Sequence, residues 1–224
     1  MTEEQKTKLM ERIGSGREYR RTNMFEIRED PQSEEKGKLV HGYATTFGEE
    51  YLLWDMGNYR VLEQIDRHAF DACDMSDVIM QYDHEGRVFA RNSNGTLRLH
   101  VDDHGLGIIA DLSGTKAGQE LYEEIRGGYT TRMSFGFRVA EDERTVVEDH
   151  ENHVITVHRT ITKISKLYDV SAVSLPANDG TEISARSWSE GVIGELEAER
   201  LRAEERARRV RAMKLKLEVK TCEN

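Results

Sequence analysis

Hydrophobic and polar residues alternate through much of the chain between residues 37 and 187, and this two-residue period is typical of β-strands. The segment 132–139 shows the period most simply, because four apolar residues fall on one side of it: Met133, Phe135, Phe137 and Val139. Ser134 falls on the other side, between two arginines and next to a glycine. The pattern predicts a half-buried strand on which Ser134 points away from the apolar side.

Similar signals predict further strands and two helices in this region. We expect strands over 38–47 and 77–84, a strand or a loop over 59–65, a hairpin over 95–112, and two strands over 153–178 with a break near Ser165. The helical patterns are a short one over 66–74 and a longer one over 115–128 that ends at two glycines. In the longer pattern, one face is apolar and holds Ala117, Leu121 and Ile125.

Many short strands with few helices indicate an α+β, mainly β fold, whose strands we expect to form an antiparallel, barrel-like core. Composition divides the chain into three regions: a charged N-terminal arm over 1–36 with a first strand within 23–29, a folded domain over 37–187, and a helical tail over 188–224. We expect the domain to hold the functional site, because nearly all of the strand pattern lies there.

The tail over 188–224 contains no proline and is rich in residues that favour helices. Its apolar residues recur every seven positions, at Leu196, Ala203, Val210 and Leu217. Charged residues at Arg200 and Lys214 interrupt the seam that a strong coiled coil needs. A long amphipathic helix that docks onto another surface is therefore the better interpretation.

The composition is polar, since 37% of the residues are hydrophobic, 33% are charged and the mean hydropathy is -0.69. We therefore expect part of the chain to be a tail or a solvated helix rather than core. Acidic residues outnumber basic ones by 42 to 32, and the net charge of -10 argues against a general nucleic-acid-binding protein.

The two cysteines, Cys73 and Cys222, are far apart in the sequence, and neither belongs to a CxxC motif. The first twenty residues lack the apolar segment of a signal peptide, and the chain has no run of 18 apolar residues. A reducing cytoplasm is therefore the expected compartment, and neither a nucleic acid nor a membrane is an expected partner.

Ser134 could act as a nucleophile only if a histidine lay within hydrogen-bond distance to accept its proton. Among the eight histidines, His84 is the best candidate, because it ends the apolar segment "VIMQYDH", where a strand would hold its imidazole at a loop edge. A carboxylate would orient that imidazole, and Asp169 interrupts an apolar strand, where a buried charge needs a partner. A Ser134–His84–Asp169 triad is therefore one hypothesis.

The sequence argues against a metal site and a phosphate-binding loop. His100 and His104 lie near three aspartates, but no HExxH motif is present, and a hairpin would send these side chains in different directions. The phosphate-binding GxxxxGK[ST] motif is absent as well, so neither a metal nor another cofactor is expected. A binding protein without catalysis stays open, since a charged barrel with a helical tail needs no active site.

Five stretches occur in a fixed order: "HGYATTFGE", "VLEQIDRHAFD", "MQYDHEGRVFA", "TTRMSFGFRV" and "ITKISKLYDVSAVSLPAN". Together they resemble motifs of the HK97-type prohead (capsid maturation) serine protease family of tailed phages, which is related in fold to the herpesvirus assemblins. In the second stretch, His68 stands where that family usually has glycine. The resemblance covers residues 39–186, and the intervals of 50 residues from His84 to Ser134 and 35 from Ser134 to Asp169 fit the family pattern.

The resemblance implies that residues 37–187 are a protease domain in which Ser134 is the nucleophile and His84 is the general base. Asp169 matches the position of the third member, where the family usually has glutamate, whose side chain is one methylene longer. The assemblins use a second histidine as the third member, which makes His158 the reserve candidate.

The resemblance also implies a serine endopeptidase that is made in the host cytoplasm and acts inside the assembling procapsid. Its expected substrate is the major capsid protein or the scaffolding segment of that protein, and we expect self-cleavage and self-association. The alternative is a non-catalytic capsid assembly or scaffolding factor that keeps a protease-like barrel and docks through its C-terminal helix.

Overall fold

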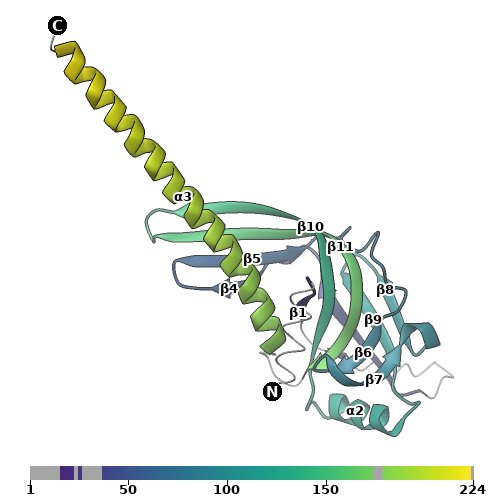
Figure 1. Ribbon diagram of the computed structural model, residues 1–224. Coiled ribbons are helices and arrows are strands. Elements are labelled where there is room, and N and C mark those ends of the chain that lie inside the picture. Colours follow the sequence, from purple (N-terminus) through teal and green to yellow (C-terminus); the bar gives the residue numbers. More distant parts are fainter. Residues whose placement is uncertain (1–15, 23–24, 27–36, 174–178, 223–224) are drawn as a thin grey trace. The chain divides into compact units, whose positions relative to one another are not determined.

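A computed structural model describes residues 16–22, 25–26, 37–173 and 179–222 (Figure 1). The chain divides into two compact units between Ala185 and Arg186, and each is described by itself. Within the described residues, no helix is both long enough and apolar enough to cross a membrane.

The larger sheet of the first unit contains seven strands and is built around the long antiparallel pair β10 and β11 (Figure 1). Its strands are β1 (Glu18–Thr22), β4 (Tyr51–Asp55), β5 (Tyr59–Ile65), β6 (Ile79–Tyr82), β7 (Glu85–Arg91), β10 (Arg132–Asp149) and β11 (Val154–Val173). On the outer side of β10, β1 forms the edge of the sheet. On the other side of β11, β5 and β6 pair with its two halves in parallel, and β4 and β7 pair antiparallel with β5 and β6.

The second sheet has four strands in the order β2-β3-β9-β8. Its strands are β2 (Phe25–Glu26), β3 (Leu39–Thr46), β8 (Leu97–Val101) and β9 (Gly105–Asp111), and the short 3-10 helix η1 (Asn92–Asn94) precedes β8. The segment β8–β9 is the hairpin that the sequence predicts over 95–112. β2 lies within the first strand expected over 23–29, while the rest of that strand lies outside the described residues.

Helix α2 (Lys116–Arg126) confirms the helix predicted over 115–128. The Thr115 hydroxyl accepts a hydrogen bond from the backbone N–H of Gly118 at 3.0 Å, which caps the first turn. Leu121 and Ile125 are buried, as the pattern predicts, and join an apolar cluster that connects the helix with both sheets. Met133, Phe135 and other apolar residues of the long strands fill the same cluster, so one core supports both sheets.

Two predicted elements differ in the structure. Residues 67–72 form consecutive turns in place of the short helix expected over 66–74, because the Asp66 carboxylate accepts the backbone N–H of His68 at 2.8 Å and starts a turn. Residues 154–173 form one strand instead of two, and the pairing with β10 skips Thr162, Ser165 and Tyr168. The predicted break near Ser165 is therefore a β-bulge, which bends the strand without ending it.

The mainly β, α+β class with a C-terminal helix is confirmed. In the described part of the chain the strands lie in two sheets and no closed barrel is found, so the predicted barrel-like core is not confirmed. The antiparallel expectation holds for most strand pairs, with the two parallel pairings of β11 as the exceptions.

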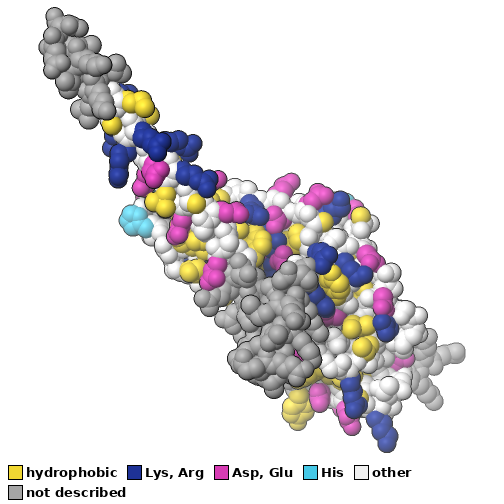
Figure 2. All heavy atoms as spheres, in the orientation of Figure 1, with side chains coloured by type: hydrophobic (Ala, Val, Ile, Leu, Met, Phe, Trp, Pro, Cys, Tyr) yellow, Lys and Arg dark blue, Asp and Glu magenta, His cyan; other side chains and the backbone are white. Residues whose placement is uncertain are grey.

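The second unit is built on helix α3 (Asp179–Cys222), which spans most of the predicted tail. Its described side chains from residue 201 to residue 214 are all exposed, and they include Leu201, Val210 and Met213. Figure 2 shows basic and acidic side chains side by side along this part of the helix. Docking of the helix onto another surface stays a prediction.

Candidate active site

Ser134 lies on β10, directly beside the edge strand β1. Its neighbours Met133 and Phe135 point into the apolar core, so the predicted alternation is confirmed. The face that carries Ser134 is also covered at this point, because Ser134 is 0% exposed. The sequence predicts a half-buried strand, whereas this part of β10 is buried on both faces.

His84 occupies a two-residue turn between β6 and β7, together with Asp83. Both residues have positive φ angles, 49° for Asp83 and 60° for His84. Two-residue hairpins favour this left-handed conformation because it matches the twist of the strands, but histidine adopts it uncommonly. The turn holds the imidazole at the end of a strand, as the sequence predicts, and His84 is only 5% exposed.

Asp169 lies on β11, and the register of the long pair brings it near Ser134. Ser134 is opposite Ser171 in this pairing, and Gly136 is opposite Asp169. Residues two apart on a strand share a face, so Ser134 and Asp169 are diagonal neighbours on one face of the sheet. Asp169 is 0% exposed, like Ser134.

The imidazole of His84 connects the other two residues. Its Nε2 atom lies 2.6 Å from Oγ of Ser134, and its Nδ1 atom lies 2.5 Å from Oδ1 of Asp169. An ionised carboxylate can only accept hydrogen bonds, so the Nδ1–H group is the donor to Asp169. Neutral His84 in this tautomer presents the lone pair of Nε2 to the serine hydroxyl, which is the arrangement that a general base requires.

Two further groups hold the carboxylate of Asp169. The hydroxyl of Ser171 donates a hydrogen bond to Oδ1 at 2.8 Å, and Arg17 forms an ion pair with Oδ2. The guanidinium of Arg17 also lies over the ring of Tyr168, with its central carbon 4.4 Å from the ring centroid. Both carboxylate oxygens are therefore occupied, which fixes the orientation of Asp169 toward His84.

Opposing effects act on the pKa of Asp169. Burial by itself raises the pKa, because it removes the charged carboxylate from water. His84, Arg17 and the Ser171 hydroxyl outweigh burial, and the pKa falls from 3.8 to about 2. Asp169 is therefore a carboxylate at neutral pH and can stabilise a positive charge on His84.

His158, the reserve candidate, belongs to a different part of β11. Its Nδ1 atom lies 2.6 Å from Oε1 of Glu50, and its side chain is 35% exposed. Both ring nitrogens of His84 already have partners, Ser134 and Asp169, so the structure gives His158 no contact through which to orient His84.

The histidines considered for a metal site have structural contacts instead. Tyr43 packs edge-on against His104, and its hydroxyl donates to Asp102 at 2.7 Å. Among the residues that the structure describes, no group of three or more histidine, cysteine, aspartate or glutamate side chains is arranged to hold a metal ion.

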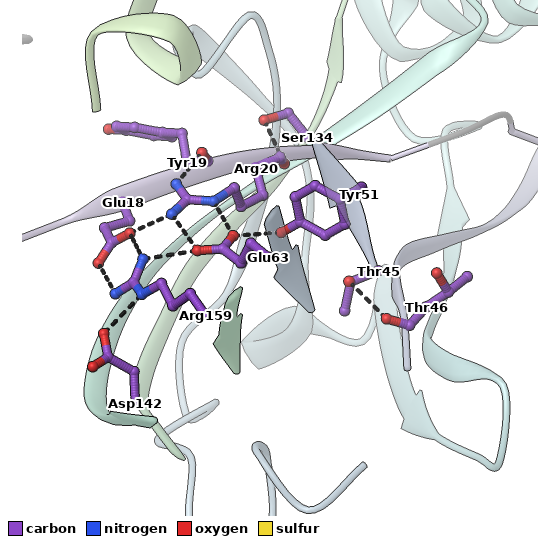
Figure 3. A network of polar contacts seen from close by, with 10 residues as sticks. All are labelled: Glu18, Tyr19, Arg20, Thr45, Thr46, Tyr51, Glu63, Ser134, Asp142 and Arg159. Carbon is purple, nitrogen blue, oxygen red and sulfur yellow. Dashed lines mark hydrogen bonds and ion pairs between the residues drawn. The ribbon is translucent and has the colours of Figure 1, made fainter. Parts of the chain in front are cut away.

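The N-terminal region contributes to the site in a way that the sequence did not predict, because residues 18–22 of the predicted charged arm form β1. The backbone carbonyl of Arg20 accepts a hydrogen bond from Oγ of Ser134 at 2.9 Å (Figure 3). No sequence signal marks this contact, since 114 residues separate the two. Ser171 was not predicted either, although a signal for it exists, because it lies two residues after Asp169 on the same strand face.

A buried network of charged side chains fixes β1 to the sheet (Figure 3). At its centre, Glu63 of β5 accepts hydrogen bonds from Arg20 of β1 at 2.9 Å and from Arg159 of β11 at 2.8 Å. Arg159 also binds Glu18 of β1 at 2.9 Å and Asp142 of β10 at 2.7 Å. Buried charges are tolerated only when they are paired, and here the pairs join four strands of one sheet.

The sequence profile of the caudovirus prohead serine protease family matches residues 24–193, which is more than half of the chain. No curated protein and no solved structure matches the chain. Residues His84, Ser134 and Asp169 all lie inside the matched segment, whereas β1 lies before it. The chain therefore belongs to the caudovirus prohead serine protease family.

Proposed function

We propose that this member of the family is an active serine endopeptidase whose catalytic residues are Ser134, His84 and Asp169. The observation that carries the proposal is the continuous set of contacts from Oγ of Ser134 through the His84 imidazole to Asp169. A nucleophile, a base and an orienting carboxylate in this order are what acyl transfer requires.

In the proposed reaction, Oγ of Ser134 attacks the carbonyl carbon of the peptide while Nε2 of His84 takes the hydroxyl proton. Asp169 stabilises the imidazolium that forms. The peptide C–N bond then breaks, His84 gives the proton to the leaving amine, and an acyl-enzyme remains. Water, deprotonated by His84, attacks the ester and restores Ser134.

The family is one of phage prohead proteases, so its role lies in capsid maturation inside the procapsid. We propose that the substrate of this chain is the major capsid protein or the scaffolding segment of that protein. We further propose that the chain is made in the host cytoplasm, associates with itself and cleaves itself.

The test is co-expression of the full chain with its capsid protein, comparing wild type with Ser134→Ala and His84→Ala. We expect a shortened capsid protein with wild type only, with the new N-terminus identified by mass spectrometry. Equal processing by wild type and both variants would overturn the proposal. If the capsid protein is not cleaved by wild type or by either variant, but procapsids assemble only when the chain is present, the chain is a non-catalytic assembly factor instead.

A further inference from the structure

β1 covers the nucleophile from the edge of the sheet. It pairs antiparallel with β10 from Glu18 opposite Phe137 to Thr22 opposite Met133, which places Arg21 opposite Ser134. With this strand in place, Ser134 and Asp169 are 0% exposed and His84 is 5% exposed. A peptide carbonyl carbon must approach Oγ closely to react, and the covered Ser134 leaves no room for one.

The hydrogen bonds of Ser134 point to the same conclusion. A hydroxyl has one proton, yet Oγ lies within hydrogen-bond distance of two groups, the Arg20 carbonyl at 2.9 Å and Nε2 of His84 at 2.6 Å. The carbonyl can only accept, so it competes with Nε2 for the one hydroxyl proton. While β1 is in place, the Arg20 carbonyl is therefore a second acceptor for the proton that Nε2 of His84 must take, and release of β1 leaves Nε2 as the acceptor.

β1 is also placed where an extended peptide would bind. It is the edge strand of its sheet, so its removal exposes backbone N–H and C=O groups of β10 without separating any other strand pair. Extended peptides commonly bind proteins by adding a strand to such an edge. The family profile begins at residue 24, after β1 ends, so β1 is not part of the matched segment.

We propose that residues 133–137 of β10 form the edge that binds the backbone of an extended peptide substrate, and that β1 is an internal occupant that keeps the protease latent. This inference rests on the proposed function. The protein changes from latent to active when β1 leaves this edge together with Arg17, after which His84 and Ser171 hold the carboxylate of Asp169. The buried ion pairs of Glu18 and Arg20 set the free energy that this release requires.

Two carboxylates form a matched pair for the test. Glu18 and Asp142 both bind Arg159, and their side chains are 15% and 14% exposed. Glu18 belongs to β1, whereas Asp142 belongs to β10. Glu18→Gln therefore weakens the attachment of β1, while Asp142→Asn removes a similar bond that does not involve it.

The readout is the rate at which a fluorophosphonate probe labels Ser134 in the full-length chain, with His84→Ala as the background. We expect Glu18→Gln to raise this rate about tenfold, because it removes the charge that pairs with Arg20 and Arg159, and Asp142→Asn to leave it unchanged. A synthetic peptide with the sequence of residues 16–22, GREYRRT, should slow the labelling of Glu18→Gln again, whereas a scrambled peptide should not. Equal rates in wild type and Glu18→Gln, or equal acceleration by both substitutions, would overturn the inference.

Hydrogen exchange of the unmodified chain provides a second measurement that needs no variant. If β1 detaches by itself, the amides of residues 18–22 exchange faster than those of residues 155–173 in β11. Exchange of both strands at one common rate would mean that β1 leaves only when the whole domain unfolds, and the inference would be wrong.

Different results would contradict the proposed function and this inference. Capsid processing that depends on Ser134, combined with rapid labelling of the wild-type chain, would leave the protease assignment standing and overturn the latent state. Processing that does not depend on Ser134 would overturn both.

Discussion

Gly136 lies directly opposite Asp169 in the pairing of β10 with β11, and the side chains of Asp169 and Arg17 fill the space where a side chain of residue 136 would lie. A Cβ atom on Gly136 would lie 2.5 Å from Oδ2 of Asp169 and 2.9 Å from the guanidinium of Arg17. Real side-chain atoms do not approach so closely, so any residue other than glycine would displace the carboxylate or its partner. The absence of a side chain at residue 136 is therefore part of how Asp169 is oriented.

We predict that Gly136→Ala slows Ser134-dependent peptide cleavage by about tenfold to a hundredfold, because small displacements of a catalytic constellation have effects of this size. The measurement is the initial rate of capsid protein processing. Gly114→Ala is the control, since a Cβ atom there meets nothing within 4 Å. Equal rates for Gly136→Ala and the control would show that Asp169 tolerates the displacement.

Removal of the Ser171 hydroxyl should weaken the orientation of Asp169 without exposing it. We expect Ser171→Ala to lower the cleavage rate by about threefold to tenfold, as expected for one lost hydrogen bond to a charged group. Ser165→Ala on the same strand also removes a hydroxyl, which donates to the backbone carbonyl of Arg138 at 3.1 Å, and it should leave the rate unchanged. Equal cleavage rates in the two variants would show that the Ser171 hydroxyl does not help to orient Asp169.

The proposed role of Asp169 as the third catalytic residue can be tested with two substitutions. Asp169→Asn keeps the shape of the side chain but removes its charge, so we predict a loss of about three to four orders of magnitude in the cleavage rate. His158→Ala should change the rate little, because His158 binds Glu50. A large loss with His158→Ala and a small one with Asp169→Asn would reverse the assignment.

Glu63 should be important for stability, since it is 0% exposed and accepts hydrogen bonds from two arginines and from Tyr51. We predict that Glu63→Gln lowers the free energy of unfolding by about 3 kcal/mol, because it leaves buried positive charge without a partner. The exposed pair of Lys163 and Glu141 provides the contrast, and Lys163→Gln should change stability by less than about 1 kcal/mol. Urea denaturation measures both values.

Acid should destabilise the domain through Glu18 and Asp169. Burial raises the pKa of Glu18, but Arg20 and Arg159 outweigh it and lower that pKa from 4.5 to about 2, and the pKa of Asp169 falls from 3.8 to about 2. Between about pH 2 and pH 4.5 the unfolded chain binds more protons than the folded chain. The contribution of these two carboxylates to the free energy of unfolding is therefore fully present above about pH 4.5 and is lost as the pH falls toward about 2.

Urea denaturation at a series of pH values tests this expectation. Glu18→Gln should be less stable than wild type at neutral pH and should lose less stability on acidification, because one of the two carboxylates is gone. Asp103→Asn, at a carboxylate that is 95% exposed, should follow the wild-type curve. An unchanged pH dependence in Glu18→Gln would mean that Glu18 does not contribute to it.

The local pattern of the sequence was enough to predict most elements of the fold. Alternation predicted β3, β6 and β10, and a capped amphipathic segment predicted α2, because these features depend on neighbouring residues. The same reasoning failed at residues 66–74, where the side chain of Asp66 makes a turn, and at Ser165, where a bulge interrupts the pairing but the strand continues.

By itself, the sequence determined which residues are candidates for chemistry: a serine on a strand, a histidine at the end of another strand, and an aspartate among apolar residues. Only the tertiary structure decided that His84 and Asp169, 85 residues apart, are in contact, because strand register and the turn at Asp83 and His84 are set by pairing across the sheet. The position of β1 was likewise decided by partners far away in the sequence. From the sequence, the charges of Glu18 and Arg20 predict a solvated arm. In the folded protein, Arg159 binds Glu18 and Glu63 binds Arg20 inside the core. These ion pairs hold β1 where the Arg20 carbonyl contacts Ser134.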